Sequence, residues 1–189
     1  KDVPRFEVKK VGVLGAGLMG QGIAHVTARA RIEVVLIDRD LASAERGKEK
    51  VAKTLDRRLK KGRTTPDRVE AILSRIHPSE RYDDLEGCDV VVEAVFEDRE
   101  LKAKVTKAAD AQLTDEAIFA SNTSGLPITD LAEASSRPEN FIGLHFFSPV
   151  ERMQMVEIVI GEKTSDQTLA KAWDYILAIK KAGIVVNDS

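Results

Sequence analysis

Several features that define whole classes of protein are scarce or missing in this sequence. Only one cysteine, Cys88, occurs in 189 residues, so no disulfide can form within the chain, and a reducing, cytoplasmic location is favoured. The longest apolar runs are far too short to cross a membrane, and the first residues do not form a signal peptide. Basic and acidic residues number 29 and 31 and are mixed along the chain, so no basic stripe indicates nucleic acid. The sequence has no P-loop, no GxSxG and no metal-ligand spacing, so hydrolase and metal hypotheses gain no support.

Strand and helix signals alternate along most of the chain. Strands are predicted at residues 10–14, 33–38, 89–95, 117–121, 141–147 and 155–160, with another near 183–187. Helices are predicted at residues 18–30, 41–61, 66–76, 99–113, 128–134 and 166–181. This alternation predicts one α/β domain of the Rossmann type, a doubly wound, mostly parallel sheet with helices on both faces.

A glycine-rich loop follows the first predicted strand at once and opens the first predicted helix. Gly15 permits a tight turn, Gly17 lets the backbone approach a pyrophosphate, and Gly20 lets helix and strand pack closely. The free amides and positive end of the following helix attract the phosphates. The cofactor contacts predicted in this loop are Gly15, Gly17, Leu18, Met19 and Gly20.

An acidic residue ends the second predicted strand, where dinucleotide-binding proteins bind a ribose. Asp38 lies 18 residues after Gly20, close to the spacing expected for the acid that binds a ribose 2′-hydroxyl. A carboxylate there also repels the 2′-phosphate of NADP, whereas the neighbouring Arg39 could accept it. The sequence therefore predicts NAD in preference to NADP.

One of the three histidines has the setting of a catalytic base. His25 and His77 are interpreted as packing or solvent residues, whereas His145 lies in a predicted strand whose apolar residues alternate onto the opposite face. Glu157 lies 12 residues later in the next strand, so an antiparallel hairpin would place the two side by side. A carboxylate there would fix the imidazole tautomer and stabilise its protonated form, as alcohol oxidation requires. Spacing alone leaves open a structural His–Glu pair at a sheet edge.

A polar segment, residues 121–125, follows a predicted strand. In open α/β sheets ligands bind beyond the carboxyl ends of the strands, so these side chains could contact a substrate or cofactor. The same residues are also ordinary turn residues, and the turn remains an alternative.

Taken together, these motifs resemble the NAD-binding domain of the L-3-hydroxyacyl-CoA dehydrogenases of fatty-acid β-oxidation. The resemblance extends over essentially the whole chain. It rests on VGVLGAGLMGQGIA at 11–24, VVEAVFED at 91–98, FASNTSGLPIT at 119–129 and GLHFFSPVERMQMVEI at 143–158.

The resemblance implies roles for individual residues of the substrate site. His145 is the implied general base toward the 3-hydroxyl group, Glu157 is its electrostatic partner, and Ser124 is the implied substrate-side serine. Ser148 stands where many members of the family have asparagine, which leaves one hydrogen bond to the substrate in doubt.

The same resemblance implies further cofactor contacts. Asp38, Glu97 and Lys102 are expected to contact NAD, and Asn122 is expected near its nicotinamide end. No metal site is implied.

The resemblance also implies that residues 1–189 are the NAD-binding domain of a longer, multifunctional protein. An enoyl-CoA hydratase domain precedes this domain in such proteins, and a helical C-terminal domain, absent here, carries dimer contacts and part of the acyl-CoA site. We therefore expect the fragment to bind NAD but to oxidise 3-hydroxyacyl-CoA poorly, and the full-length protein to be oligomeric.

Two alternative functions remain open. The chain could belong to a dehydrogenase of the same superfamily that acts on 3-hydroxybutyryl-CoA or on a hydroxy acid without CoA. It could also be a non-catalytic NAD-binding module, although such a module has no chemical need for His145, Glu157 and Ser124.

Overall fold

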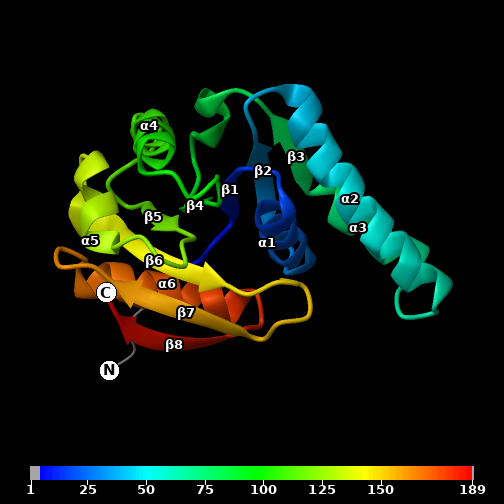
Figure 1. Cartoon of the computed structure of the whole chain (residues 1–189). Helices are drawn as coiled ribbons and strands as arrows, with labels where there is room; N and C mark the ends of the chain where they lie inside the picture. The colour runs from blue at the N-terminus through cyan, green and yellow to red at the C-terminus, as the bar shows by residue number, and fades with distance from the viewer. Residues whose placement is uncertain (1–4, 189) are drawn as a thin grey trace.

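The computed structural model describes residues 5–188, and the centre of this part is an eight-stranded sheet (Figure 1). Its strands are β1 (Lys10–Leu14), β2 (Glu33–Ile37), β3 (Ile76–Ser79), β4 (Val90–Glu93), β5 (Ile118–Ser121), β6 (Phe141–Phe146), β7 (Met155–Ile160) and β8 (Ala182–Asn187). Their order is β3-β2-β1-β4-β5-β6-β7-β8. The first six strands of this order are parallel, β7 runs antiparallel to β6, and β8 runs parallel to β7. The predicted mostly parallel sheet is confirmed.

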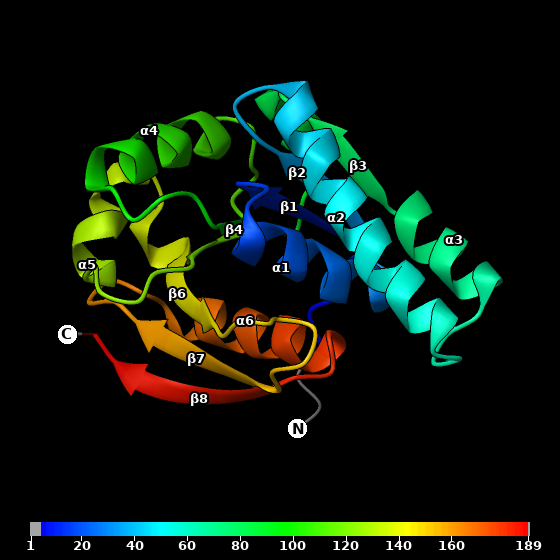
Figure 2. The ribbon, with the colours of Figure 1, turned by 45° about the vertical axis from the view of Figure 1, so that its right-hand side comes forward.

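Helices cover both faces of the sheet, as predicted. They are α1 (Leu18–Arg29), α2 (Leu41–Lys60), α3 (Pro66–Ser74), α4 (Arg99–Asp110), α5 (Ile128–Leu131) and α6 (Asp166–Ala178). Three short 3₁₀ helices, η1 (Tyr82–Leu85), η2 (Ala132–Ala134) and η3 (Pro138–Asn140), complete the connections. Figures 1 and 2 show α4 and α5 on one side of the sheet, away from α1, α2 and α3.

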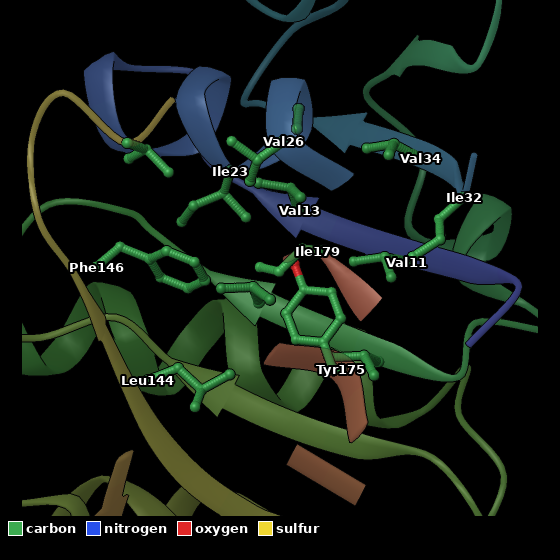
Figure 3. Packing of buried hydrophobic residues seen from close by; sticks show 14 of the residues in the cluster. Val11, Val13, Ile23, Val26, Ile32, Val34, Leu144, Phe146, Tyr175 and Ile179 are labelled. Carbon is green, nitrogen blue, oxygen red and sulfur yellow. The ribbon is translucent and has the colours of Figure 1, made fainter. Parts of the chain in front are cut away.

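The buried strands divide their side chains between two apolar clusters. In β4, Val90 and Val92 join the cluster beneath α1, α2 and α6, whereas Val91 joins the cluster beneath α4 and α5. This alternation follows from the period of two in a strand, and the continuous apolar runs in the sequence reflect burial on both faces. Figure 3 shows the first cluster, with Tyr175 of α6 reaching toward β1. The Tyr175 hydroxyl pairs with the Thr27 hydroxyl at 2.8 Å, so its polar end is satisfied within the core.

One strand was missing from the sequence prediction. The helix predicted to reach residue 76 ends at Ser74, and Ile76–Ser79 form the edge strand β3, where a connection was predicted. Pro78 lies in this strand, which is tolerated because an edge strand leaves one row of amides without a ladder partner. The helices predicted to end at residues 113 and 181 also end early, at Asp110 and Ala178.

The strand predicted near the end of the chain is confirmed as β8, while residues 1–4 and Ser189 lie outside the described part. Within residues 5–188, no helix is both long enough and apolar enough to span a bilayer.

A buried histidine lies on α1. The His25 side chain is buried, and among the described residues its Nε2 atom has no hydrogen-bond partner. Burial lowers the pKa of His25 from the ordinary 6.5 to about 4, and Arg29 adds to this while Glu151 opposes it. Between these two values the unfolded chain binds the proton and the folded chain does not, so acid favours unfolding.

We predict that the free energy of unfolding falls as the pH is lowered from 6.5 to about 4, by on the order of 3 kcal/mol from His25 alone. Urea unfolding of the wild type and of His25→Leu at pH 7 and pH 4.5 measures this, and the variant should lose markedly less stability on acidification. His77→Gln is the control, because His77 is exposed and pairs with Glu33 at 2.7 Å. Equal acid sensitivity of wild type and His25→Leu would contradict the assignment.

Candidate active site

The turn between β1 and α1 requires glycine at two positions. Gly15 has φ +99°, and a Cβ atom there would lie 2.6 Å from the carbonyl oxygen of Ala94. A Cβ atom on Gly20 would lie 1.7 Å from the carbonyl oxygen of Gly15, so any side chain would push α1 off β1. Gly17 is different: it is exposed, and a Cβ atom would meet nothing within 4 Å. The open side of the loop is therefore at Gly17.

The amino end of α1 is arranged to receive an anion. Gly17 is the N-cap residue, and no described side chain caps the helix or places an acid in its first turn. The first amides of a helix have no partner within the helix, and the helix dipole makes this end positive. A pyrophosphate would satisfy these amides at the place where Gly17 leaves space for it.

Asp38 lies directly after β2, beside the same loop. Its carboxylate accepts hydrogen bonds from the backbone amides of Ala16, at 2.8 Å, and Arg39, at 2.7 Å. The acid is thereby held against the glycine loop. The Arg39 side chain points to solvent and forms an exposed ion pair with Asp40 at 3.5 Å.

Strands β6 and β7 form an antiparallel hairpin, the arrangement in which the sequence spacing pairs His145 with Glu157. Their register places His145 directly opposite Glu157, and Nδ1 of His145 lies 3.7 Å from Oε2 of Glu157. The imidazole is 23% exposed and the carboxylate 36% exposed, so the pair is open on one side. The apolar residues of β6 (Ile142, Leu144 and Phe146) point into the core on the other face.

A cavity of about 340 Å³ brings together residues from four separate motifs. It is lined by Met19, Ala94, Val95, Glu97, Asn122, Ser124, His145, Phe146, Phe147 and Ser148. The glycine loop, the VVEAVFED segment, the polar segment and the β6–β7 turn thus meet at the carboxyl ends of β1, β4, β5 and β6. His25 and His77 do not line this cavity.

Glu97 holds the polar segment in place on one side of the cavity. It accepts hydrogen bonds from the hydroxyl of Thr123 (2.7 Å) and from the amide (3.1 Å) and hydroxyl (3.3 Å) of Ser124. Burial alone would raise the pKa of Glu97, but these bonds, with the charge of Lys102, hold it below its usual value. The carboxylate is therefore ionised at neutral pH.

Lys102, a predicted cofactor contact, is buried in the structure. Its side chain is only 1% exposed, and its ammonium group donates to Glu93 at 2.6 Å and to the carbonyl of Asn122 at 3.2 Å. The direct contact between Lys102 and the cofactor stays a prediction, and in the structure this ammonium group is enclosed by protein.

Glu93 is a site residue that the sequence interpretation missed. It ends β4 with its carboxylate 1% exposed and accepts bonds from Lys102, from the hydroxyl of Ser121 (2.6 Å) and from the amide of Val95 (3.0 Å). Burial raises the pKa of Glu93 against the lowering effect of Lys102 and the hydrogen bonds. An acid inside an otherwise apolar strand was the available signal, because such an acid requires a buried partner.

Comparison with known proteins identifies the family. Residues 10–189 match the family model described as "3-hydroxyacyl-CoA dehydrogenase, NAD binding domain". This chain belongs to the 3-hydroxyacyl-CoA dehydrogenase family. The family model indicates NAD as the cofactor. The uncapped end of α1, the open space at Gly17 and the carboxylate of Asp38 beside the loop are features that suit a dinucleotide.

Solved structures of the family share both fold and sequence with this chain. The (S)-3-hydroxybutyryl-CoA dehydrogenase of Ralstonia eutropha is 41% identical with a TM-score of 0.94, over 97% of this chain and 65% of that one. The dehydrogenase part of multifunctional enzyme 1 of C. elegans is 30% identical with a TM-score of 0.88, over 98% of this chain and 43% of that one. The 3-hydroxybutyryl-CoA dehydrogenase of Escherichia coli K12 is 29% identical with a TM-score of 0.94, over 97% and 39%. The chain therefore spans less than two thirds of the length of these relatives.

We predict that Gly17→Ala weakens NAD binding about tenfold or more without lowering the melting temperature. The added methyl group would meet nothing in the protein, but it would occupy the space nearest the first amides of α1. Titration of NADH by fluorescence and a thermal melt measure the two effects.

Gly20→Ala provides the contrast, because its methyl group would meet the Gly15 carbonyl and should lower the melting temperature itself. Unchanged NADH affinity in Gly17→Ala would show that the cofactor does not pass this point of the loop.

Proposed function

We propose that this chain supplies the NAD site and the catalytic pair of an enzyme that oxidises L-3-hydroxyacyl-CoA to 3-oxoacyl-CoA, as in fatty-acid β-oxidation. The observation that carries the proposal is the pairing of His145 with Glu157 at a cavity that also contains Ser124 and the end of the glycine loop. These groups come from separate segments of the chain, and alcohol oxidation needs all of them at one place.

Oxidation of a secondary alcohol removes a proton from oxygen and two electrons with a hydrogen from carbon. NAD, when bound, supplies the acceptor for the hydride. Because Nδ1 of His145 faces Glu157, Nε2 is the atom that takes the proton from the 3-hydroxyl group. The carboxylate of Glu157 fixes the tautomer and stabilises the imidazolium that forms.

The remaining polar groups of the cavity orient the ligands in this proposal. Ser124 and Ser148 line the cavity and can donate hydrogen bonds to the substrate oxygen. Glu97, Asp38 and the loop residues Gly15–Gly20 contact NAD, and Asn122 lies beside its nicotinamide end.

Two kinds of relative support different parts of this proposal. The similarity to enzymes named for 3-hydroxybutyryl-CoA favours a short acyl chain as the second candidate, and the similarity to the dehydrogenase part of a multifunctional enzyme favours a place in a longer protein. In our proposal a helical domain outside this chain completes the acyl-CoA site and carries the oligomer contacts. Turnover of 3-hydroxyacyl-CoA substrates of increasing acyl length by the complete protein separates a preference for 3-hydroxybutyryl-CoA from activity on longer acyl chains.

We predict that His145→Gln and Glu157→Gln, made in the complete reading frame, each lower kcat by about 10²- to 10⁴-fold, because the first removes the proton acceptor and the second removes the charge that stabilises the imidazolium. The affinity for NADH should stay nearly constant, since neither side chain belongs to the glycine loop. His77→Gln, on the exposed edge strand β3, is the matched control and should retain full turnover. Wild-type turnover in His145→Gln would exclude the mechanism, and NAD binding without any turnover in the wild type would favour a non-catalytic module.

A further inference from the structure

A buried ion pair lies directly behind the cavity, between β4 and α4. Glu93 and Lys102 are each 1% exposed, and their charged atoms are 2.6 Å apart. Two charges lose their hydration when they are buried in this way, so such a pair is weak evidence for stability. Its contacts with the cavity wall point to a different role.

The pair is bonded to the first two residues of the polar segment. Ser121 donates its hydroxyl to Glu93, and Lys102 donates to the carbonyl oxygen of Asn122. The backbone amide of Asn122 also donates to the backbone carbonyl of Glu93 at 2.8 Å. The start of the segment is thereby fixed to the end of β4.

Glu97 continues the network to the cavity itself. Its carboxylate lies 3.6 Å from the ammonium group of Lys102 and accepts the bonds from Thr123 and Ser124. A single ammonium group therefore lies between two carboxylates, of which Glu93 is buried and Glu97 holds the substrate-side serine.

Asn122 connects the same network to the catalytic strand. Its side-chain oxygen accepts a hydrogen bond from the backbone amide of Phe146 at 2.9 Å, next to His145. The polar segment thus contains Ser124 and, through Asn122, contacts the backbone beside His145.

We propose that Glu93 and Lys102 are positioning residues, which hold the segment Asn122–Gly125 and the adjoining part of β6 in the geometry that oxidation requires. The assignment rests on the proposed dehydrogenase function. When the charge of Glu93 is removed, Glu97 is the one carboxylate of the described residues that remains within 4 Å of the Lys102 ammonium group. Glu97 is then drawn toward Lys102 and releases Ser124.

The opposite end of α4 offers a matched control. Asp110 is 7% exposed, accepts bonds from Ser135 and Ser136, and lies 3.5 Å from Arg137. Like Glu93, Asp110 is buried and interacts with hydroxyl groups and with one cationic side chain. It lies on α4, as Lys102 does, but at the end of that helix away from the cavity. Asp110→Asn therefore reports the general effect of weakening a buried acidic cluster of this domain.

The experiment compares Glu93→Gln with Asp110→Asn in the complete protein. Hydrogen exchange measured by mass spectrometry follows the peptides that contain residues 122–125 and 145–147, and steady-state kinetics follow kcat and the Kd for NADH. We expect Glu93→Gln to speed exchange in both peptides and to lower kcat by about 10- to 100-fold, with a smaller loss of NADH affinity because Glu97 and Asn122 also contact the cofactor in our proposal. Asp110→Asn should change the stability of the protein but neither kcat nor the exchange of these two peptides.

Ser121→Ala keeps the ion pair and should give a smaller effect of the same kind as Glu93→Gln. It replaces Glu93→Gln in the experiment if that variant does not fold.

Three outcomes would overturn the assignment. In the first, Glu93→Gln or Ser121→Ala matches Asp110→Asn in kcat and in exchange. In the second, kcat falls while exchange is unchanged. In the third, Lys102→Met weakens NADH binding much more than Glu93→Gln does. The last result would establish Lys102 as a direct cofactor contact. An absence of dehydrogenase turnover in the wild type would refute the proposed function instead, and the exchange data would still decide whether the pair positions the segment.

Discussion

The register between β6 and β7 is the constraint on which the candidate site depends. An antiparallel strand added to a parallel sheet places its side chains opposite those of its neighbour, and here the pairing sets Glu157 against His145. Because side chains alternate between the faces of a strand, a shift of one residue would turn Glu157 into the core and Val156 or Ile158 out of it. Burial of these two residues on the opposite face therefore fixes Glu157 opposite His145, whatever the attraction between the two side chains contributes.

The parallel strands of the sheet position the other groups of the candidate site at the same edge. Strands β1, β4, β5 and β6 all point their carboxyl ends toward the cavity, so the four segments that follow them are neighbours although they lie far apart in sequence. The glycine loop contributes backbone amides, because its glycines allow an approach that side chains would block. The other three segments contribute carboxylate, amide, hydroxyl and imidazole groups. In the proposed function, the backbone amides bind the charged pyrophosphate and the side chains carry out the proton transfer.

Much of this arrangement was predictable from the sequence. Given an antiparallel hairpin, the 12-residue separation was enough to pair His145 with Glu157, and the glycine loop followed from its position between a strand and a helix. Strand β3 was not predictable from periodicity, since His77 and Pro78 interrupt the apolar pattern and only its edge position accommodates a proline. The buried network was missed for another reason. Glu93 and Lys102 are nine residues apart in sequence, and only the packing of α4 against β4 brings their charges together.

A structure of the complete protein with NAD and a 3-oxoacyl-CoA bound tests the central claim most directly. The account predicts the 3-oxygen of the acyl group within about 3 Å of Nε2 of His145 and within reach of the Ser124 hydroxyl, with Glu157 still against Nδ1. An acyl group bound away from His145, or a Glu157 carboxylate turned away from the imidazole, would contradict it.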